Sequence, residues 1–310
     1  MSRIRFGFAT VLGGIVLLAA FTASGWYVAV PGARTGFLSC AGAFVVILAN
    51  CFGLSLIGSR FSARPVGLIP FIYIALVAAN PATLHWTPCH PASLLLIAMI
   101  FCYLQFCSGQ SSNEYLAASC LLLGTAGLFM PPILWLFPVF LLLGAGRTPS
   151  KGKSLVTALI GLILPLLVYG GILYLRSGTD AALSLPLRLW EGMTKLSPGI
   201  PPFRATTLAR ITVIMVATLI AFIDIASKLN TYKIIQFLAF VRLIILTVAL
   251  CVMTLLFAKD NHTSCALATY LPITLLLNEY LAAPGKGRTK TALAVAAILL
   301  LVAERISLLL

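Results

Sequence analysis

Residues 80–93, NPATLHWTPCHPAS, contain two of the three histidines of the chain, His85 and His90, together with Cys89. An imidazole titrates near neutral pH, so either histidine could act as a general acid or base. His90 also has a structural interpretation, because it precedes Pro91, a residue type that favours the first position of a helix. Its imidazole could cap that helix or face water. We therefore treat His85 and His90 as candidate catalytic residues and leave the structural role of His90 open.

A metal site is the second chemistry that this segment could support. HWTPCH at residues 85–90 and DNHTSC at residues 260–265 supply imidazoles, thiols and a carboxylate, which are ligand types of zinc. Their spacing matches no established zinc signature. The eight cysteines include no CxxC pair and fall mostly within apolar runs, where cysteine behaves as a small hydrophobic residue. We therefore expect neither a metal nor another cofactor.

Residues 176–207 form a long connection between apolar runs and hold further candidates. Leu183, Leu187 and Trp190 fall on one helical face, so the segment could lie in the lipid headgroup plane at the outer face. An ordinary loop that touches the membrane is the alternative, because Trp and Arg are enriched at interfaces. An arginine suits phosphate because it can donate two hydrogen bonds at once. The candidates are Asp180 and Glu191 for proton transfer, with Arg188, Arg204 and the nearby Arg210 for phosphate.

Arg242, in FLAFVRLIIL, lies about nine residues into an apolar run and is the ionisable group placed furthest inside a predicted span. Such groups are costly in a membrane and are functional hypotheses by default. Arg242 could bind a ligand, or it could pair with a buried carboxylate or with exposed carbonyls. Asp224, Glu279 and the pair at residues 304–305 lie nearer the predicted membrane boundaries. We interpret these groups as snorkelling to the interface.

The elements that must position these residues are membrane helices. The chain has 310 residues, of which 61% are hydrophobic and 9% charged, and its mean hydropathy is +1.07. A soluble domain has roughly 25% charged residues. The composition therefore predicts one all-α, polytopic membrane domain over residues 1–310. No stretch is long enough for a separate soluble domain.

Breaks at Pro, Gly and charge clusters predict about eleven membrane helices. The formal charge of +14 concentrates in alternate connections, which the positive-inside rule places in the cytoplasm together with the N-terminus. This explains the charge without a nucleic-acid partner and makes anionic membrane lipids the expected partners. The predicted spans are 6–28, 36–57, 66–80, 92–108, 115–130, 131–146, 154–175, 208–227, 234–257, 264–283 and 291–309.

Pro131 and Pro132 interrupt the apolar run in residues 115–146. Neither proline has an N–H, and a residue that precedes proline avoids the α region, so the helix must break there. Each arm of about 16 residues would reach roughly 24 Å, less than the ~30 Å hydrocarbon core. We expect a short helical hairpin that either crosses a thinned region or re-enters.

His90-Pro91-Ala92, the polar turn SGQSSNEYLAAS and GTAGLFMPPILWLFPVFLLL resemble an uncharacterised family of polytopic bacterial inner-membrane proteins, over roughly residues 80–175. This resemblance implies a bacterial inner membrane and transfers no catalytic residue. More distantly, the many short spans and the outer segment are similar to C-type-fold glycosyltransferases, which take sugars from polyprenyl phosphate at the outer face. Those enzymes usually carry an acid in the first outer loop, whereas VAVPGARTGF here has Arg34 and no carboxylate.

Three functions remain open on the sequence alone. A glycosyltransferase-like enzyme would act on polyprenyl-phosphate-linked substrates, with the arginines on phosphate and the histidines or acids moving the proton. A lipid or solute transporter would use broken helices, with Arg242 in the path. A non-catalytic assembly partner would bind other membrane proteins of the cell envelope.

Overall fold

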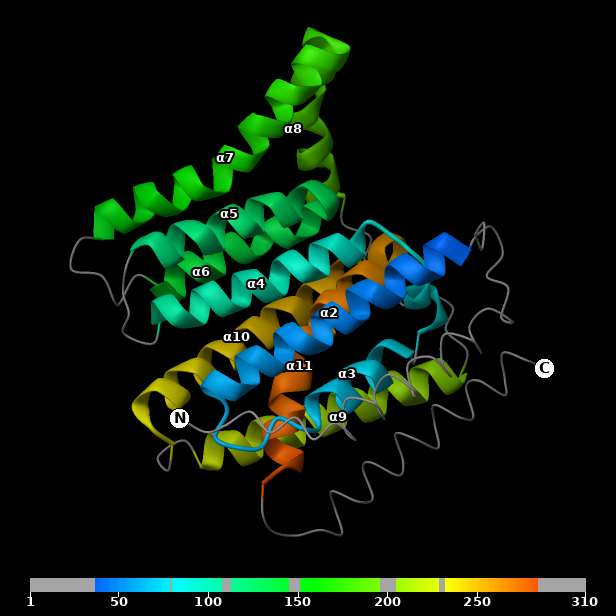
Figure 1. The fold of residues 1–310 in the computed structure, drawn as a ribbon, viewed down its shortest axis with the longest axis vertical. Coiled ribbons are helices and arrows are strands. Elements are labelled where there is room, and N and C mark those ends of the chain that lie inside the picture. Colours follow the sequence, from blue (N-terminus) through cyan, green and yellow to red (C-terminus); the bar gives the residue numbers. More distant parts are fainter. Residues whose placement is uncertain are drawn as a thin grey trace. The chain divides into compact units, whose positions relative to one another are not determined.

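The computed structural model describes residues 37–78, 80–107, 113–144, 151–195, 205–228 and 232–283. These residues form α-helices and two short 3-10 helices, with no strand among them, which confirms the all-α prediction (Figure 1). The helices are α2 (Phe37–Phe61), α3 (Ile69–Ala78), η1 (Pro81–Leu84), α4 (Cys89–Cys107), α5 (Asn113–Phe129), η2 (Pro131–Trp135), α6 (Leu136–Gly144), α7 (Lys151–Ser177), α8 (Thr179–Thr194), α9 (Ala205–Ser227), α10 (Ile234–Leu256) and α11 (Ala258–Leu281).

Four helices in the described ranges are long and apolar enough to cross a membrane, which indicates a membrane protein. They are Ser39–Phe61, Cys89–Cys107, Gly152–Ser177 and Ile234–Leu256. Every predicted span between residues 36 and 283 coincides with a helix or, at 131–146, with η2 and α6. Several are shorter apolar helices of 10–17 residues, so length and composition do not support about eleven crossings. The predicted spans 6–28 and 291–309 lie outside the described residues.

The chain divides into two compact units, each built from separated segments. The first unit comprises Met1–Thr87, Ile200–Phe240 and Tyr270–Leu310, and thus holds α2, α3, η1, α9, the start of α10 and the end of α11. The second unit comprises Pro88–Gly199 and Val241–Thr269. It holds α4 to α8 and the rest of α10 and α11. The prediction of a single membrane domain stays a prediction.

Two glycines let α5 and α7 pack closely in the second unit. A Cβ atom on Gly161 would lie 2.7 Å from the Ala117 carbonyl oxygen, and one on Gly124 would collide with the Leu162 carbonyl oxygen. Small residues at a helix contact allow such close backbone approach, which is a common way to associate helices in lipid. The α5–α7 contact therefore depends on these two glycines.

The helix break at Pro131 and Pro132 lies where the sequence predicts it. Helix α5 ends at Phe129, Met130 has an extended backbone (φ −145°, ψ 82°), and η2 begins with the two prolines. The turn is fixed to α8, because the Trp135 Nε1 donates a hydrogen bond of 3.0 Å to the Met193 carbonyl oxygen.

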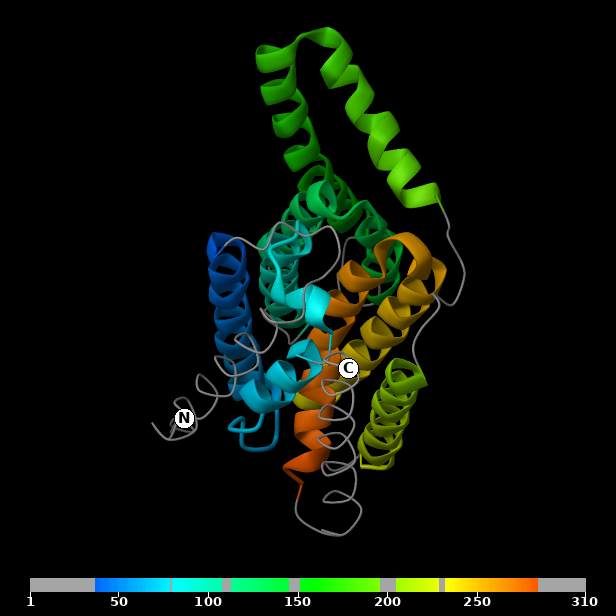
Figure 2. The ribbon, with the colours of Figure 1, turned by 90° about the vertical axis from the view of Figure 1, so that its right-hand side faces the viewer.

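Helix α8 turns back from the end of α7, and Figure 2 shows the two helices joined at this turn. The connecting residue Gly178 has φ +84°, a conformation that L side chains rarely adopt. Leu185 and Leu189 are buried, whereas Leu183, Leu187 and Trp190 are exposed. The exposed face predicted from the spacing is therefore present, and its placement in the headgroup plane of the outer face stays a prediction.

Candidate functional site

The four predicted catalytic residues lie in different surroundings. His85 belongs to the first unit and follows η1, with its side chain buried. His90 lies in α4 of the second unit and is fully buried. Asp180 and Glu191 lie along α8 with exposed side chains. The two imidazoles are buried and the two carboxylates are exposed, so the structure does not bring the four side chains into one site. Their catalytic role stays a prediction.

The predicted phosphate-binding arginines are likewise dispersed. Arg188 is exposed on α8. Arg242 is buried in α10, where it interacts electrostatically with the Tyr103 hydroxyl of α4. Arg204 lies outside the described residues, and Arg210 is in α9 with its side chain outside them. The predicted role of Arg242 in phosphate or lipid binding stays a prediction.

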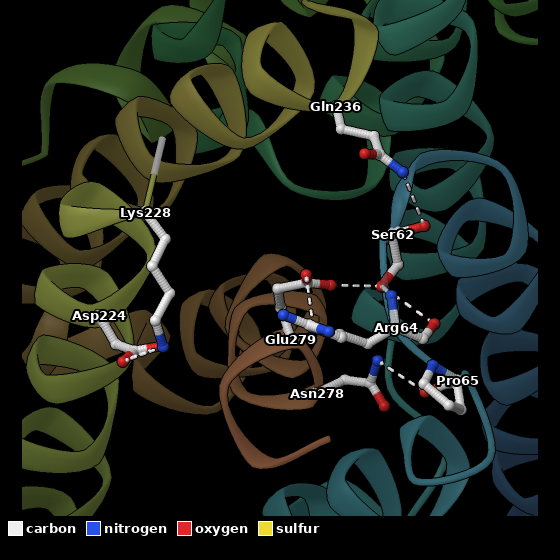
Figure 3. Close-up of polar contacts among 8 residues, drawn as sticks. All are labelled: Ser62, Arg64, Pro65, Asp224, Lys228, Gln236, Asn278 and Glu279. Atoms are coloured by element: carbon white, nitrogen blue, oxygen red, sulfur yellow. Dashed lines mark hydrogen bonds and ion pairs between the residues drawn. The ribbon is translucent and has the colours of Figure 1, made fainter. Parts of the chain in front are cut away.

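A cluster of polar residues, the Glu279 cluster, lies where the end of α11 meets the loop after α2 (Figure 3). We define it as Ser62, Arg64, Tyr232, Gln236, Asn278 and Glu279. The Ser62 hydroxyl donates a hydrogen bond to Glu279 Oε2. The Arg64 Nε lies 3.8 Å from Glu279 Oε1, with the Glu279 side chain 0% exposed and that of Arg64 31% exposed. The interpretation of Glu279 as a snorkelling residue is therefore wrong, because its carboxylate is turned into the protein.

The same cluster holds the loop that follows α2. The Gln236 Nε2 donates to the Ser62 carbonyl oxygen, and the Asn278 Nδ2 donates to the Pro65 carbonyl oxygen, both at 3.3 Å. The Arg64 backbone N–H donates to the Ser62 hydroxyl at 3.1 Å. Beyond Phe61, where α2 ends, side chains of α10 and α11 therefore supply the donors that bind the carbonyl oxygens of this loop.

Tyr232 lies beside the Glu279 carboxylate and stacks at a tilt on Phe240, with ring centroids 5.1 Å apart. Burial raises the pKa of the Tyr232 phenol, and the negative charge of Glu279 and a hydrogen bond to it raise the pKa further. Asp224 also raises it, and that carboxylate is paired with Lys228 at 2.5 Å (Figure 3). The Glu279 cluster thus places a neutral phenol among charged groups.

A second buried polar pair lies in the middle of α2. The Asn50 Nδ2 donates a hydrogen bond of 2.8 Å to the Tyr73 hydroxyl of α3. Both residues are 0% exposed. Buried polar groups need such partners, because an unmade hydrogen bond costs about 1–3 kcal/mol.

A third pair lies near the first residue of α2. The Cys40 Sγ and the His85 Nδ1 are 3.6 Å apart, and both side chains are buried. The Trp86 backbone N–H donates to the Ser39 hydroxyl at 3.0 Å, which holds this part of the chain against α2. All three polar groups lie in the first unit.

Sequence reasoning named His85 but missed its partner Cys40, the pair Asn50–Tyr73, and Ser62. The available signal was Asn50, an amide within the apolar run FVVILANCFGLSL. Cys40 carried no such signal, because an isolated cysteine in an apolar helix is normally a small hydrophobic residue.

The described residues are helical, and four of their helices are long and apolar enough to cross a membrane, which indicates an all-α membrane protein. The chain belongs to the DUF6427 family, a family of unknown function, which matches residues 34–306. No curated protein and no solved structure matches the chain.

Proposed function

We propose that the protein is a transport protein that conducts protons across the bacterial inner membrane through its first unit. The supporting observation is that buried polar groups occur at three levels of one helix, α2. Cys40 with His85 lies near one end, Asn50 with Tyr73 near the middle, and the Glu279 cluster beyond the other end. With about 1.5 Å of rise per residue, Cys40 and Asn50 are about 15 Å apart along the helix, and Asn50 and Ser62 about 18 Å apart.

The chemistry of the two ends suits proton transfer. Chains of Asp, Glu and His residues inside membrane proteins form proton relays. His85 supplies an imidazole, a group that can both accept and donate a proton, and Glu279 supplies a carboxylate held by Ser62 and Arg64. At the middle level, the Tyr73 hydroxyl and the Asn50 amide can hydrogen-bond to water molecules that connect the two ends of the path.

Protonation of Glu279 would change the contacts of the loop after α2. The neutral carboxyl group loses its electrostatic attraction to Arg64, while the hydrogen bonds from Gln236 and Asn278 to the loop remain. The loop would therefore be held less tightly in the protonated state. Binding of a proton to Glu279 would thus shift the loop after α2 between a tightly held and a loosely held state, and a transport protein needs two such states.

The positive-inside rule orients the path. Arg60, Arg64, Lys228 and Lys233 lie near the Glu279 end, so that end faces the cytoplasm and His85 faces outward. A cytoplasmic N-terminus follows from the alternation of basic connections, and about eleven spans follow from the breaks between apolar runs. Both belong to the same proposal.

A glycosyltransferase-like activity on polyprenyl-phosphate-linked substrates is the second candidate, and one observation favours it. The exposed Leu183, Leu187 and Trp190 lie on α8 beside the exposed Arg188. An amphipathic helix of this kind could lie at the interface and meet lipid phosphates. The enzyme would then use the candidate catalytic and phosphate-binding residues that the sequence predicts at the outer face.

The proton path is tested by reconstituting the purified protein in lipid vesicles that enclose a pH-sensitive dye. A potassium gradient with valinomycin sets the membrane potential. We expect faster proton uptake than in protein-free vesicles, and loss of this uptake in Glu279→Gln. The matched control is Glu114→Gln, which changes an exposed acid on α5 and should conduct like the wild type. Uptake no faster than in protein-free vesicles contradicts the proposal.

A further inference from the structure

One face of α2 carries an exposed apolar stripe that ends in an arginine. Val45, Ala49, Phe52 and Leu56 are exposed, and so is Arg60 in the last turn of the helix. Spacings of three and four residues place these side chains on one helical face. Helix α2 is also one of the four described helices that are long and apolar enough to cross a membrane. The stripe therefore offers a surface suited to hydrocarbon, with a cation at one end.

The length of the stripe matches one leaflet of a bilayer. Its apolar part, from Val45 to Leu56, extends over about 16 Å along the helix, and half of the ~30 Å hydrocarbon core is about 15 Å. Arg60 lies about 6 Å beyond Leu56, at the depth of the lipid headgroups. At the other end, the Trp86 ring covers the same face at Gly42, where a Cβ atom would lie 2.9 Å from the ring. The stripe is therefore as long as one acyl chain and does not cross the whole membrane.

A second cation lies near the Arg60 end of the stripe. The Gln236 Nε2 donates a hydrogen bond of 3.3 Å to the Ser62 carbonyl oxygen, so the start of α10 lies beside the loop after α2 (Figure 3). Lys233 directly precedes α10, and its side chain is exposed. The two segments that this hydrogen bond joins thus carry Arg60 and Lys233, both exposed.

The charge at this end of the first unit favours an anionic ligand. Each of the two carboxylates that the structure describes here is in an ion pair, Glu279 with Arg64 and Asp224 with Lys228. The described cations at this end are Arg60, Arg64, Lys228 and Lys233. This leaves an excess of two positive charges. Basic residues near a membrane surface attract anionic headgroups, and an arginine can donate two hydrogen bonds to one phosphate.

We propose that the stripe on α2 binds one acyl chain of an anionic phospholipid, and that Arg60 and Lys233 bind the phosphate of its headgroup. The ligand contacts exposed side chains only, so it reaches the site directly from the bilayer. The site is distinct from the phosphate-binding arginines that the sequence predicts on α8, α9 and α10. The inference rests on α2 crossing the membrane and does not depend on the proposed proton path.

The test is native mass spectrometry of the full-length protein in mild detergent. The protein is titrated with dioleoyl phosphatidylglycerol, which is anionic, or with dioleoyl phosphatidylcholine, which has no net charge. We expect the wild type to bind the first phosphatidylglycerol more tightly than the first phosphatidylcholine. Arg60→Gln and Lys233→Gln should each weaken phosphatidylglycerol binding about fivefold, the effect of one basic residue near an anionic headgroup.

The matched control for charge is Lys153→Gln, which removes an exposed cation of α7 and should bind phosphatidylglycerol like the wild type. Size-exclusion chromatography of each variant shows whether it is folded. Equal affinity of the wild type for the two lipids overturns the proposal. Unchanged phosphatidylglycerol affinity in the folded double variant Arg60→Gln/Lys233→Gln overturns it as well.

The acyl-chain part of the site has its own test. Phe52→Ala should weaken phosphatidylglycerol binding, because it removes apolar surface from the stripe. Phe129→Ala, the same change at an exposed phenylalanine of α5, should have no effect. Equal binding by these two variants would show that the lipid does not lie on the stripe. Inorganic phosphate at the same concentration should not displace the lipid, and displacement would show a site for free phosphate in place of the proposed lipid site.

Discussion

The Ser62 hydroxyl donates a hydrogen bond to the Glu279 carboxylate, although the two residues are 217 positions apart in the chain. This contact joins the loop after α2 to the end of α11 within the first unit. Arg64 and Asn278 add contacts between the same two segments. The Glu279 cluster therefore has a structural effect, anchoring the loop, in addition to the proton-binding role that we propose.

Ser62→Ala should lower the free energy of unfolding by about 1–3 kcal/mol. The substitution leaves a buried carboxylate oxygen of Glu279 without its donor, and an unmade buried hydrogen bond has a cost of this size. Thermal unfolding in detergent, followed by circular dichroism, measures the change. Ser59→Ala is the control, because the Ser59 hydroxyl bonds only within its own helix, to the Leu56 carbonyl oxygen. Equal effects of the two substitutions would show that the Ser62–Glu279 bond contributes little.

Gly124→Ala should destabilise the protein by about 1–3 kcal/mol, as overpacking commonly does. The new methyl group would collide with the Leu162 backbone, which cannot move away as a side chain can. Gly171→Ala is the matched control in α7, because a Cβ atom there meets nothing within 4 Å. That control should be neutral or slightly stabilising, since alanine favours helix by about 1 kcal/mol over glycine. A stable Gly124→Ala variant would contradict the close α5–α7 contact.

The raised pKa of Tyr232 predicts a pH dependence of stability. Because the folded state holds this phenolic proton more tightly than the unfolded state, the stabilisation is fully present below the ordinary tyrosine pKa of about 10. It is lost as the pH rises above that value towards the folded-state pKa. The melting temperature of the wild type should therefore fall more steeply above pH 10 than that of Tyr232→Phe. Tyr174→Phe, at an exposed tyrosine, should retain the steep fall, and identical profiles for the wild type and Tyr232→Phe would contradict the pKa shift.

The positions of the helices could be predicted because they depend on local properties of the sequence. Pro131 and Pro132 end α5 through missing donors and steric clashes that need no tertiary information. The exposed face of α8 follows from the helical spacing of Leu183, Leu187 and Trp190. The number of membrane crossings could not be predicted in this way. A short apolar helix such as Ile69–Ala78 has the composition of a membrane span but not its length.

The polar groups of the first unit could not be assembled in the same way. Distance along a helix gave the depth of Glu279 but not the direction of its side chain, and the structure turns that side chain inward. The pairing of Cys40 with His85 brings together residues 45 positions apart in the chain, and it is a tertiary contact with no sequence signature. Asn50 was the detectable case, because an amide in an apolar run requires a partner.

The most direct test of the proton path compares two substitutions of Glu279 in the vesicle assay. Glu279→Asp keeps a titratable carboxyl group, whereas Glu279→Gln keeps only the shape and can still accept the Ser62 hydrogen bond. We predict that the aspartate variant conducts protons in part and that the glutamine variant conducts none, with both proteins folded. If Glu279→Gln conducts as fast as the wild type, the Glu279 cluster only anchors the loop after α2, and the proposed path is wrong.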